Sequence, residues 1–481
     1  MNNKIFVLGL IQIIIITLCY GISYTKAELS LPETISFTEI SGSGAMTGWY
    51  GGVSQNVHTV YCSYNDRWYG VYPEYVGTSI QLHYCYSDSG DYLNWNDGGI
   101  LPSGAWIALL SPTGGMGDYP FGSFCSLTYS NITGKLYCAS VHGSTYNRVG
   151  IETGEIQGDG SVTWTVTYKV IADAVFNIDG YGAHVDITTD KVTGYPIICC
   201  SGYNTSASAF KTVIAYAYSE SPENEEFYYS VIDNLPNGER YSSVVSTGEN
   251  EVFIIEGCAT ELNKLYGGFI NSSSLNPTVS GITDYNVKKW SDVNSYDFMD
   301  YSVSYNDLTV YICYTDESYN LRFFSVDIET GVFSSEELLF DGESSLSSFQ
   351  PCLSVNDYTP SIFYFEHNST YNLGYIIEKT PIGWSEKLNV FNIEYSTSQY
   401  NLLSSCRFSD TTNIIINRFG DNSMIGMAIN FTGYGQEEPE EPSEPYTPPT
   451  IDWSGVKYIL AFVVFLIIFS FAIYIKTGGK R

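Results

Sequence analysis

The chain has 481 residues, with 21 Lys and Arg against 52 Asp and Glu, and its formal net charge is −31. A negative field of this size repels nucleic acid and anionic lipid, so neither is an expected ligand. The charge keeps an exposed domain soluble. It also fits an external medium of low pH, in which carboxylates are protonated. The 42 tyrosines favour strands, because tyrosine fits a pleated surface well.

The N-terminus has the order of a secretion signal. Lys4 is followed by an apolar run from Ile5 to Cys19, and small residues lie around Ala27. We predict a cleaved signal peptide over residues 1–27. An uncleaved anchor helix is the alternative. In either case the chain is expected to leave the cytosol.

The C-terminal part of the chain predicts a membrane anchor. The stretch from Tyr458 to Ile475 is uncharged and mostly apolar, long enough to span a hydrocarbon core about 30 Å thick. We expect a stalk rich in Glu and Pro over residues 435–455, a transmembrane helix over 456–475, and a cytoplasmic tail over 476–481. The tail is basic, which favours its cytoplasmic placement. The predicted localisation is a single-pass protein on a cell surface or virion envelope, with its ectodomain outside.

A repeated unit runs through residues 28–434. Each copy is a short strand, an Asn/Asp/Gly turn and a second strand rich in aromatic or β-branched residues, as where residues 301–307 precede residues 309–314. The turns lie near residues 65, 131, 190, 249, 306, 356 and 410. Seven copies of this length, each with room for about four strands, predict an all-β fold, a seven-bladed β-propeller.

The last copy is short by one strand. Residues 423–431 provide its third strand, after which the polar linker begins. A strand-like segment over residues 34–40 stands unassigned before the first copy. We predict that this segment completes the seventh blade and locks the first part of the propeller to the last, since closure leaves only short edges.

The mature chain keeps ten cysteines once Cys19 leaves with the signal. An even number in an exported protein predicts disulfides, with buried thiols as the alternative. Adjacent cysteines in a strand point to opposite faces, so Cys199 and Cys200 are expected to have different partners. The candidates are Cys62, Cys85, Cys125, Cys138, Cys199, Cys200, Cys258, Cys313, Cys352 and Cys406.

Asn-x-Ser/Thr tripeptides mark candidate glycan acceptors on surface turns. They lie at Asn131, Asn204, Asn271, Asn368 and Asn430. No Cys-x-x-Cys pair and no Cys/His cluster occurs in the sequence, so no metal site and no cofactor are expected.

Some turns resemble the Asp-box turns of sialidase-like propellers, whose pattern is Ser-x-Asp-x-Gly-x-x-Trp. Residues 87–95 contain Asp88-x-Gly90, although Tyr86 replaces the Ser and Trp95 falls two residues late. Residues 158–164 and 382–385 resemble the Asp-box pattern more loosely. The resemblance implies a propeller fold. For activity, it implies three arginines on a substrate carboxylate, a Tyr/Glu nucleophile pair and an acidic acid/base.

The sequence does not supply that catalytic set. The ectodomain arginines are scattered among strands and turns, and the Arg-Ile-Pro element of the family is absent. The six ectodomain arginines are Arg67, Arg148, Arg240, Arg322, Arg407 and Arg418. Neither Gly-x-Ser-x-Gly nor His-Glu-x-x-His occurs. We therefore expect no catalytic residues and no enzyme activity.

Binding is the function that remains. Exposed aromatic side chains stack on sugars or anchor proteins, and the cluster Trp68, Tyr69, Tyr72 and Tyr75 lies near a turn. We expect a membrane-anchored recognition or adhesion protein whose partner is a glycan or protein on another surface. One alternative is a membrane-tethered sialidase-like glycoside hydrolase. Another is a structural surface-coat component with lateral self-association.

Overall fold

The structure is a computed structural model, and one compact unit spans Met1–Tyr434. The residues that it describes are 34–41, 59–76, 79–102, 125–142, 148–167, 184–204, 209–223, 226–232, 240–258, 264–271, 285–286, 289–291, 297–299, 301–341, 351–356, 359–367, 371–380, 383–394, 400–408, 411–418 and 423–430. The predicted signal peptide, stalk, transmembrane helix and tail lie outside these residues. Among the residues described, no helix is long and apolar enough to cross a membrane.

The strands form antiparallel sheets in chain order, named here sheets I to VII. Sheet I holds β2 (Thr59–Cys62), β3 (Arg67–Val76), β4 (Ser79–Asp88) and β5 (Asp91–Ile100). Sheet II holds β6 (Cys125–Ser130), β7 (Lys135–His142), β8 (Arg148–Ile156) and β9 (Val162–Thr167). Sheet III holds β10 (His184–Thr189), β11 (Pro196–Asn204), β12 (Ala209–Ala217) and β13 (Phe227–Ile232). Sheet IV holds β14 (Arg240–Gly248), β15 (Glu251–Cys258), β16 (Lys264–Asn271) and β17 (Tyr285–Asn286).

The remaining strands complete the series. Sheet V holds β20 (Tyr301–Tyr305), β21 (Thr309–Thr315), β22 (Leu321–Asp327) and β23 (Glu337–Phe340). Sheet VI holds β24 (Cys352–Asn356), β25 (Thr359–His367), β26 (Tyr371–Thr380), β27 (Gly383–Trp384) and β28 (Leu388–Glu394). Sheet VII holds β29 (Tyr400–Phe408), β30 (Thr411–Arg418), β31 (Ser423–Asn430) and β1 (Thr34–Ser41). A two-stranded ribbon, β18 (Lys289–Ser291) with β19 (Asp297–Met299), stands between sheets IV and V in the chain.

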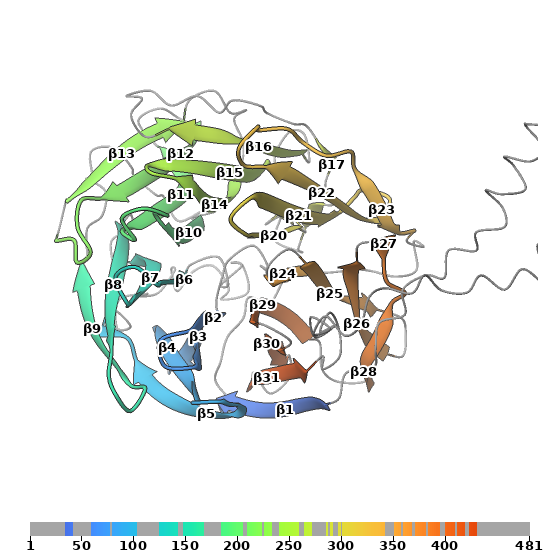
Figure 1. The fold of residues 1–481 in the computed structure, drawn as a ribbon, viewed down its shortest axis with the longest axis horizontal. Helices are drawn as coiled ribbons and strands as arrows, with labels where there is room; N and C mark the ends of the chain where they lie inside the picture. Colours follow the sequence, from blue (N-terminus) through green and yellow to red (C-terminus); the bar gives the residue numbers. More distant parts are fainter. Residues whose placement is uncertain are drawn as a thin grey trace, which may run out of the picture. The chain divides into compact units, whose positions relative to one another are not determined.

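The first strand of each sheet lies nearest the centre of the unit (Figure 1). These strands contact one another in chain order, from β2 through β6, β10, β14, β20 and β24 to β29, and β29 contacts β2 again. The sheets therefore radiate from a common axis, and the fold is an all-β propeller, as the repeats predicted. Each turn position read from the sequence falls between the first and second strands of a sheet, except residue 356, which is the last residue of the first strand β24.

The ring is closed by the N-terminal strand. β1 pairs antiparallel with β31, from Thr34 opposite Asn430 to Ser41 opposite Met424. Sheet VII therefore takes its outer strand from the start of the chain and its other three from the end. This confirms the expected pairing of the segment around residues 34–40 with the last strand of the repeat region.

The hydrophobic core lies between neighbouring sheets. One cluster of buried side chains joins sheets I, II and III, and others join III to IV, IV to V, and V to VI. In β11, Ile198 and Cys200 belong to the first of these clusters, and Ile197 and Cys199 to the cluster shared with sheet IV. Both faces of an interior strand are thus covered, because successive side chains point to opposite faces.

Candidate functional site

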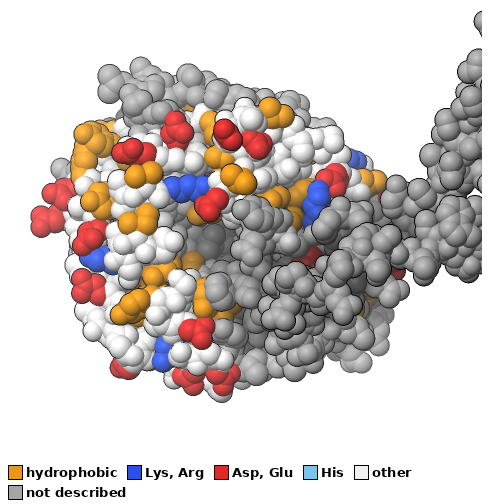
Figure 2. All heavy atoms as spheres, in the orientation of Figure 1, with side chains coloured by type: hydrophobic (Ala, Val, Ile, Leu, Met, Phe, Trp, Pro, Cys, Tyr) orange, Lys and Arg blue, Asp and Glu red, His pale blue; other side chains and the backbone are white. Residues whose placement is uncertain are grey.

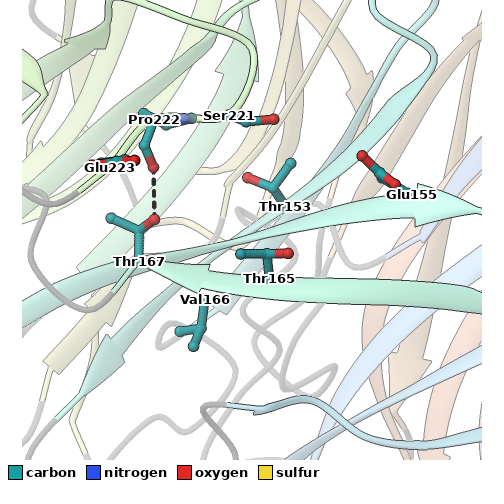
Figure 3. Close-up of a pocket in the computed structure, with 8 residues that line it drawn as sticks. All are labelled: Thr153, Glu155, Thr165, Val166, Thr167, Ser221, Pro222 and Glu223. Atoms are coloured by element: carbon teal, nitrogen blue, oxygen red, sulfur yellow. Dashed lines mark hydrogen bonds between the residues drawn. The ribbon is translucent and has the colours of Figure 1, made fainter.

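A groove of about 450 Å³ lies between sheets II and III. Strands β8 and β9 form one wall and the turn that joins β12 to β13 forms the other (Figure 3). The lining residues are Thr153, Glu155, Thr165, Val166, Thr167, Ser221, Pro222 and Glu223. This volume falls within the range of small-molecule sites.

Register places the groove's hydroxyl groups together. Thr153 of β8 is directly opposite Thr165 of β9. Thr165 and Thr167 are two residues apart and share a face, whereas Val166 points to the other side of the strand (Figure 3). The Thr167 hydroxyl donates to the Pro222 carbonyl at 2.7 Å, which fastens the turn to the edge strand.

Lys135, the first residue of β7, contacts the same turn. Its Nζ donates to Glu220 Oε1 at 3.2 Å and to Ser221 Oγ at 2.6 Å, and it lies 3.7 Å from Glu155 Oε1. The Tyr137 hydroxyl donates to the Glu220 carbonyl at 2.9 Å. Lys135, which contacts the groove residue Ser221, is therefore neutralised by two carboxylates. What the groove presents is a set of hydroxyls and carboxylate oxygens, which bind hydrogen-bonding groups.

Two aromatic rings flank this turn. Tyr218 and Tyr228 meet edge to face, with ring centroids 3.9 Å apart. They are 46% and 63% exposed, in contrast to the buried tyrosines of the strand interiors. The exposed pair offers an apolar platform with polar tips, on the hairpin that also carries the groove's Ser221 and Pro222.

A second hollow, the axial cavity, has a volume of about 270 Å³. It is lined by three consecutive residues from each of β2, β6, β10, β14, β20 and β24. They are residues 59–61, 127–129, 186–188, 243–245, 303–305 and 353–355. Among these lining residues Asp186 is the one carboxylic acid; the others are apolar or carry hydroxyl groups.

Asp186 is 3% exposed. Its Oδ1 accepts hydrogen bonds from Ser126 Oγ at 2.6 Å and from the Ile187 N–H at 2.9 Å, and its Oδ2 accepts one from the Val244 N–H at 2.9 Å. These donors come from β6, β10 and β14, so one side chain joins three successive sheets. Burial raises the pKa of Asp186 to about 6, against the opposing effect of its three hydrogen bonds.

The structure corrects the ligand face expected from the sequence. Trp68, Tyr69 and Tyr72 are 0%, 1% and 1% exposed, so their rings do not reach the surface. They lie on the second strand of sheet I, where neighbouring strands and sheets cover both faces, and the Tyr69 hydroxyl donates to the Gly160 carbonyl of sheet II's last turn. The Tyr75 side chain lies outside the described part of the chain.

The cysteines also depart from expectation. None of the eight described cysteines is in a disulfide, and all eight are buried. Cys199 and Cys200 point to opposite faces of β11 and pack as thiols in different hydrophobic clusters. Burial raises the pKa of both thiols. Cys258 and Cys406 lie outside the residues whose side chains are described.

One predicted glycan acceptor can be placed. Asn131 is exposed on the turn between β6 and β7, as a glycosylated asparagine requires. The side chains of Asn204, Asn271, Asn368 and Asn430 lie outside those described.

The described arginines do not converge on one site. Arg67 of sheet I donates to the Ser87 carbonyl and lies 3.8 Å from Asp88, and Arg322 of sheet V contacts Asp316 and Glu336. Each is held by acids of its own sheet. The other four predicted arginines lie outside the described side chains. Within the described residues, no group of His, Cys, Asp and Glu is placed to hold a metal ion.

The turns that resemble Asp boxes join third and fourth strands. Asp88 precedes the β4–β5 turn, and Asp159 lies in the β8–β9 turn, where its Oδ1 accepts from the Ser161 N–H and hydroxyl. Trp164 follows and packs edge to face on Tyr84 of sheet I. These turns therefore serve packing between sheets. The groove was missed by sequence reasoning because the turn that forms its second wall lies more than 50 residues from Thr165.

No protein-family model and no curated protein matches the chain. Among solved structures, a polysaccharide lyase described as an ulvan lyase aligns with a TM-score of 0.51 and 9% identity, over 82% of this chain and 95% of that one. A second structure of that description, bound to -[GlcA(1-4)Rha3S]-, gives a TM-score of 0.50 and 9% identity, with the same coverage. The endosialidase of phage phi92 gives 0.40 and 9% identity, over 86% of this chain and 71% of that one. At such identities the likeness to the lyases shows the fold alone, and the chain is a β-propeller.

Proposed function

We propose that the chain is a membrane-anchored extracellular recognition protein that binds glycan on another surface through the groove between sheets II and III. The observation that carries this proposal is the groove's lining of hydroxyl and carboxylate oxygens, together with the exposed Tyr218–Tyr228 pair on the hairpin that carries Ser221 and Pro222. Sugars present hydroxyl groups that pair with such oxygens, and C–H faces that stack on aromatic rings. The two ulvan-lyase structures, which share the fold, support a polysaccharide as the ligand class.

The proposed ligand is a neutral glycan. A glycan with carboxylate or sulfate groups needs a cation at the site. Six described cations each lie within 4.0 Å of a carboxylate of the protein itself. They are Arg67, Lys135, Lys191, Arg322, Lys379 and Lys387. With a net charge of −31, the protein would repel a polyanion over long range.

The architecture completes the proposal. We take sheets I to VII as seven blades of one ring, since their first strands contact in chain order and β29 returns to β2. The signal peptide over residues 1–27 and the membrane span over 456–475 would place this ring outside the membrane on the acidic stalk. A glycan on Asn131 would lie on the turn between β6 and β7.

The test is a glycan array probed with residues 28–434 as wild type, Thr165→Val and Thr163→Val. Valine keeps the branched shape that suits a strand and removes the hydroxyl. Thr163 is the matched control, exposed on the same strand but not lining the groove. We expect binding to neutral glycans that weakens about 5- to 10-fold in Thr165→Val, the loss of roughly one hydrogen bond, and is unchanged in Thr163→Val. Equal binding by the two variants would contradict the site, and retention of anionic glycans only would contradict the ligand class.

A second candidate is a membrane-tethered carbohydrate-active enzyme, favoured by the fold shared with the ulvan lyases. It would need a catalytic set in addition to the groove's oxygens. Glu155 and Glu223 both line the groove, so a pair of carboxyl groups is at least available there. Formation of a shortened or unsaturated product separates this candidate from binding alone.

A further inference from the structure

The wall of the axial cavity contains a tie that crosses three sheets. Asp186 of β10 accepts a hydrogen bond from Ser126 of β6 on one side and from the Val244 N–H of β14 on the other. Both bonds run between neighbouring sheets rather than within one. The side chain is 3% exposed, yet it is among the residues that line the cavity.

At the equivalent position of sheet V, a side chain without an ionisable group makes the hydrogen bond to the next sheet. Asp186 is opposite Cys199 in sheet III, and Ser302 is opposite Cys313 in sheet V. Ser302 Oγ accepts from the Leu353 N–H of sheet VI at 3.0 Å, just as Asp186 accepts from Val244 of sheet IV. A hydroxyl therefore suffices to join two sheets here. Asp186 places an ionisable group at the equivalent point.

Among the residues that the structure describes, those that act on the pKa of Asp186 supply no compensating positive charge. Its own hydrogen-bond partners are a hydroxyl and two backbone N–H groups, all neutral. The titratable groups that interact with it are Cys199 from β11 and Tyr301 and Tyr305 from β20. The pKa values of all three are raised by burial, so they stay neutral through the acid and neutral range. Glu256 of β15 is a second buried carboxyl that interacts with Cys199 and Tyr301.

We propose that Asp186 is a proton-binding switch in the axial wall, which makes the junction of sheets II, III and IV firmer in an acidic medium than in a neutral one. A neutral carboxyl keeps oxygen atoms that accept from Ser126 and Val244, and it removes the penalty of a buried charge. An ionised carboxyl keeps the hydrogen bonds but bears that penalty. The switch needs no ligand, and it is independent of the groove.

The direction of the pH effect follows from linkage. The pKa of Asp186 is about 6 in the folded chain and 3.8 is its ordinary value, so the folded state binds the proton more tightly than the unfolded state. Stability from this group is therefore complete below about pH 4 and is lost as the pH rises through 6. This is the reverse of a carboxylate in an ion pair, whose stabilising effect is lost on acidification.

The experiment compares melting temperatures of the full chain in detergent at pH 4 and pH 7 for wild type, Asp186→Asn and Asp307→Asn. Asp307 is the matched control, because its side chain is 94% exposed. On moving from pH 7 to pH 4, wild type should gain about 3 °C relative to Asp186→Asn, given the size of the linkage term and the entropy of unfolding of a domain this large. Asp307→Asn should follow wild type. Equal pH dependence in wild type and Asp186→Asn would overturn the proposal.

A direct titration keeps the proposal testable if Asp186→Asn does not fold. Infrared difference spectra of wild type should show one protonated carboxyl that forms between pH 7 and pH 5 in the folded protein. The signal should be absent in Asp186→Ser, which keeps a hydroxyl like that of Ser302 at the equivalent point of sheet V, and it should persist in Glu256→Gln. If the folded wild type takes up no proton at a buried carboxyl in that interval, or if the signal disappears in Glu256→Gln, Asp186 is not the switch.

Discussion

Glycine packing decides how closely the outer strands of sheet II approach. A Cβ on Gly154 of β8 would come within 2.7 Å of Val162 Cγ1 and 2.8 Å of the Trp164 ring. Trp164 is itself held against Tyr84 of sheet I. The Trp164 ring therefore cannot move away from a Cβ at residue 154 without disturbing the packing between sheets I and II.

We predict that Gly154→Ala lowers the free energy of unfolding by about 1–3 kcal/mol, the usual effect of overpacking. Gly158→Ala is the control, since a Cβ there meets nothing within 4 Å and the position is in the following turn. Chemical denaturation of both variants measures the difference. A Gly154→Ala protein as stable as the control would show that the strands are less tightly packed than described.

Single residues also show where sequence reasoning ends. The pattern of aromatic and β-branched residues predicted β3 as a strand, but not which of its tyrosines are exposed. Tyr64 in the turn is 81% exposed, whereas Trp68, four residues later, is 0% exposed. The expected ligand face at Trp68, Tyr69 and Tyr72 failed for this reason. In a propeller both faces of an interior strand are covered, so alternation along the strand carries no information about exposure.

At the scale of elements, the closing strand is the feature that the sequence predicted best. Counting strands in each repeat left one strand missing at the end and one unassigned at the start, and β1 pairs with β31 as that count required. The details of sheet VI were not predictable in the same way. In sheet VI the strand that pairs with β26 is interrupted, so that β27 and β28 are two separate strands that both pair with β26. Lys387, in the break, reaches across to Glu366 at 2.7 Å.

Deleting residues 28–42 should lower the melting temperature of the unit, because β31 loses its outer partner and its backbone groups are left at an open edge. Deleting residues 436–450 is the control, since that segment lies beyond the compact unit Met1–Tyr434. A synthetic peptide of residues 28–42 should restore part of the loss. Unchanged melting after the first deletion would contradict the role of β1 as the closing strand.

At the scale of the whole molecule, charge and architecture point in the same direction. The net charge of −31 and the pairing of six described cations with the protein's own carboxylates disfavour polyanionic partners. The sequence predicted the propeller. It could not predict the groove, because the contact of Thr167 with Pro222 joins two residues that are 55 positions apart in the chain and belong to different sheets.

The proposed function is binding without turnover, and product analysis tests it most directly. Residues 28–434 are incubated with each glycan retained on the array, and the glycans are then examined by mass spectrometry. The account predicts that the retained glycan is recovered intact, because the proposed role of the hydroxyls and carboxylates in the groove is to hold the glycan by hydrogen bonds. Recovery of shortened or unsaturated fragments, lost in Glu155→Gln or Glu223→Gln, would contradict the account and identify a carbohydrate-active enzyme.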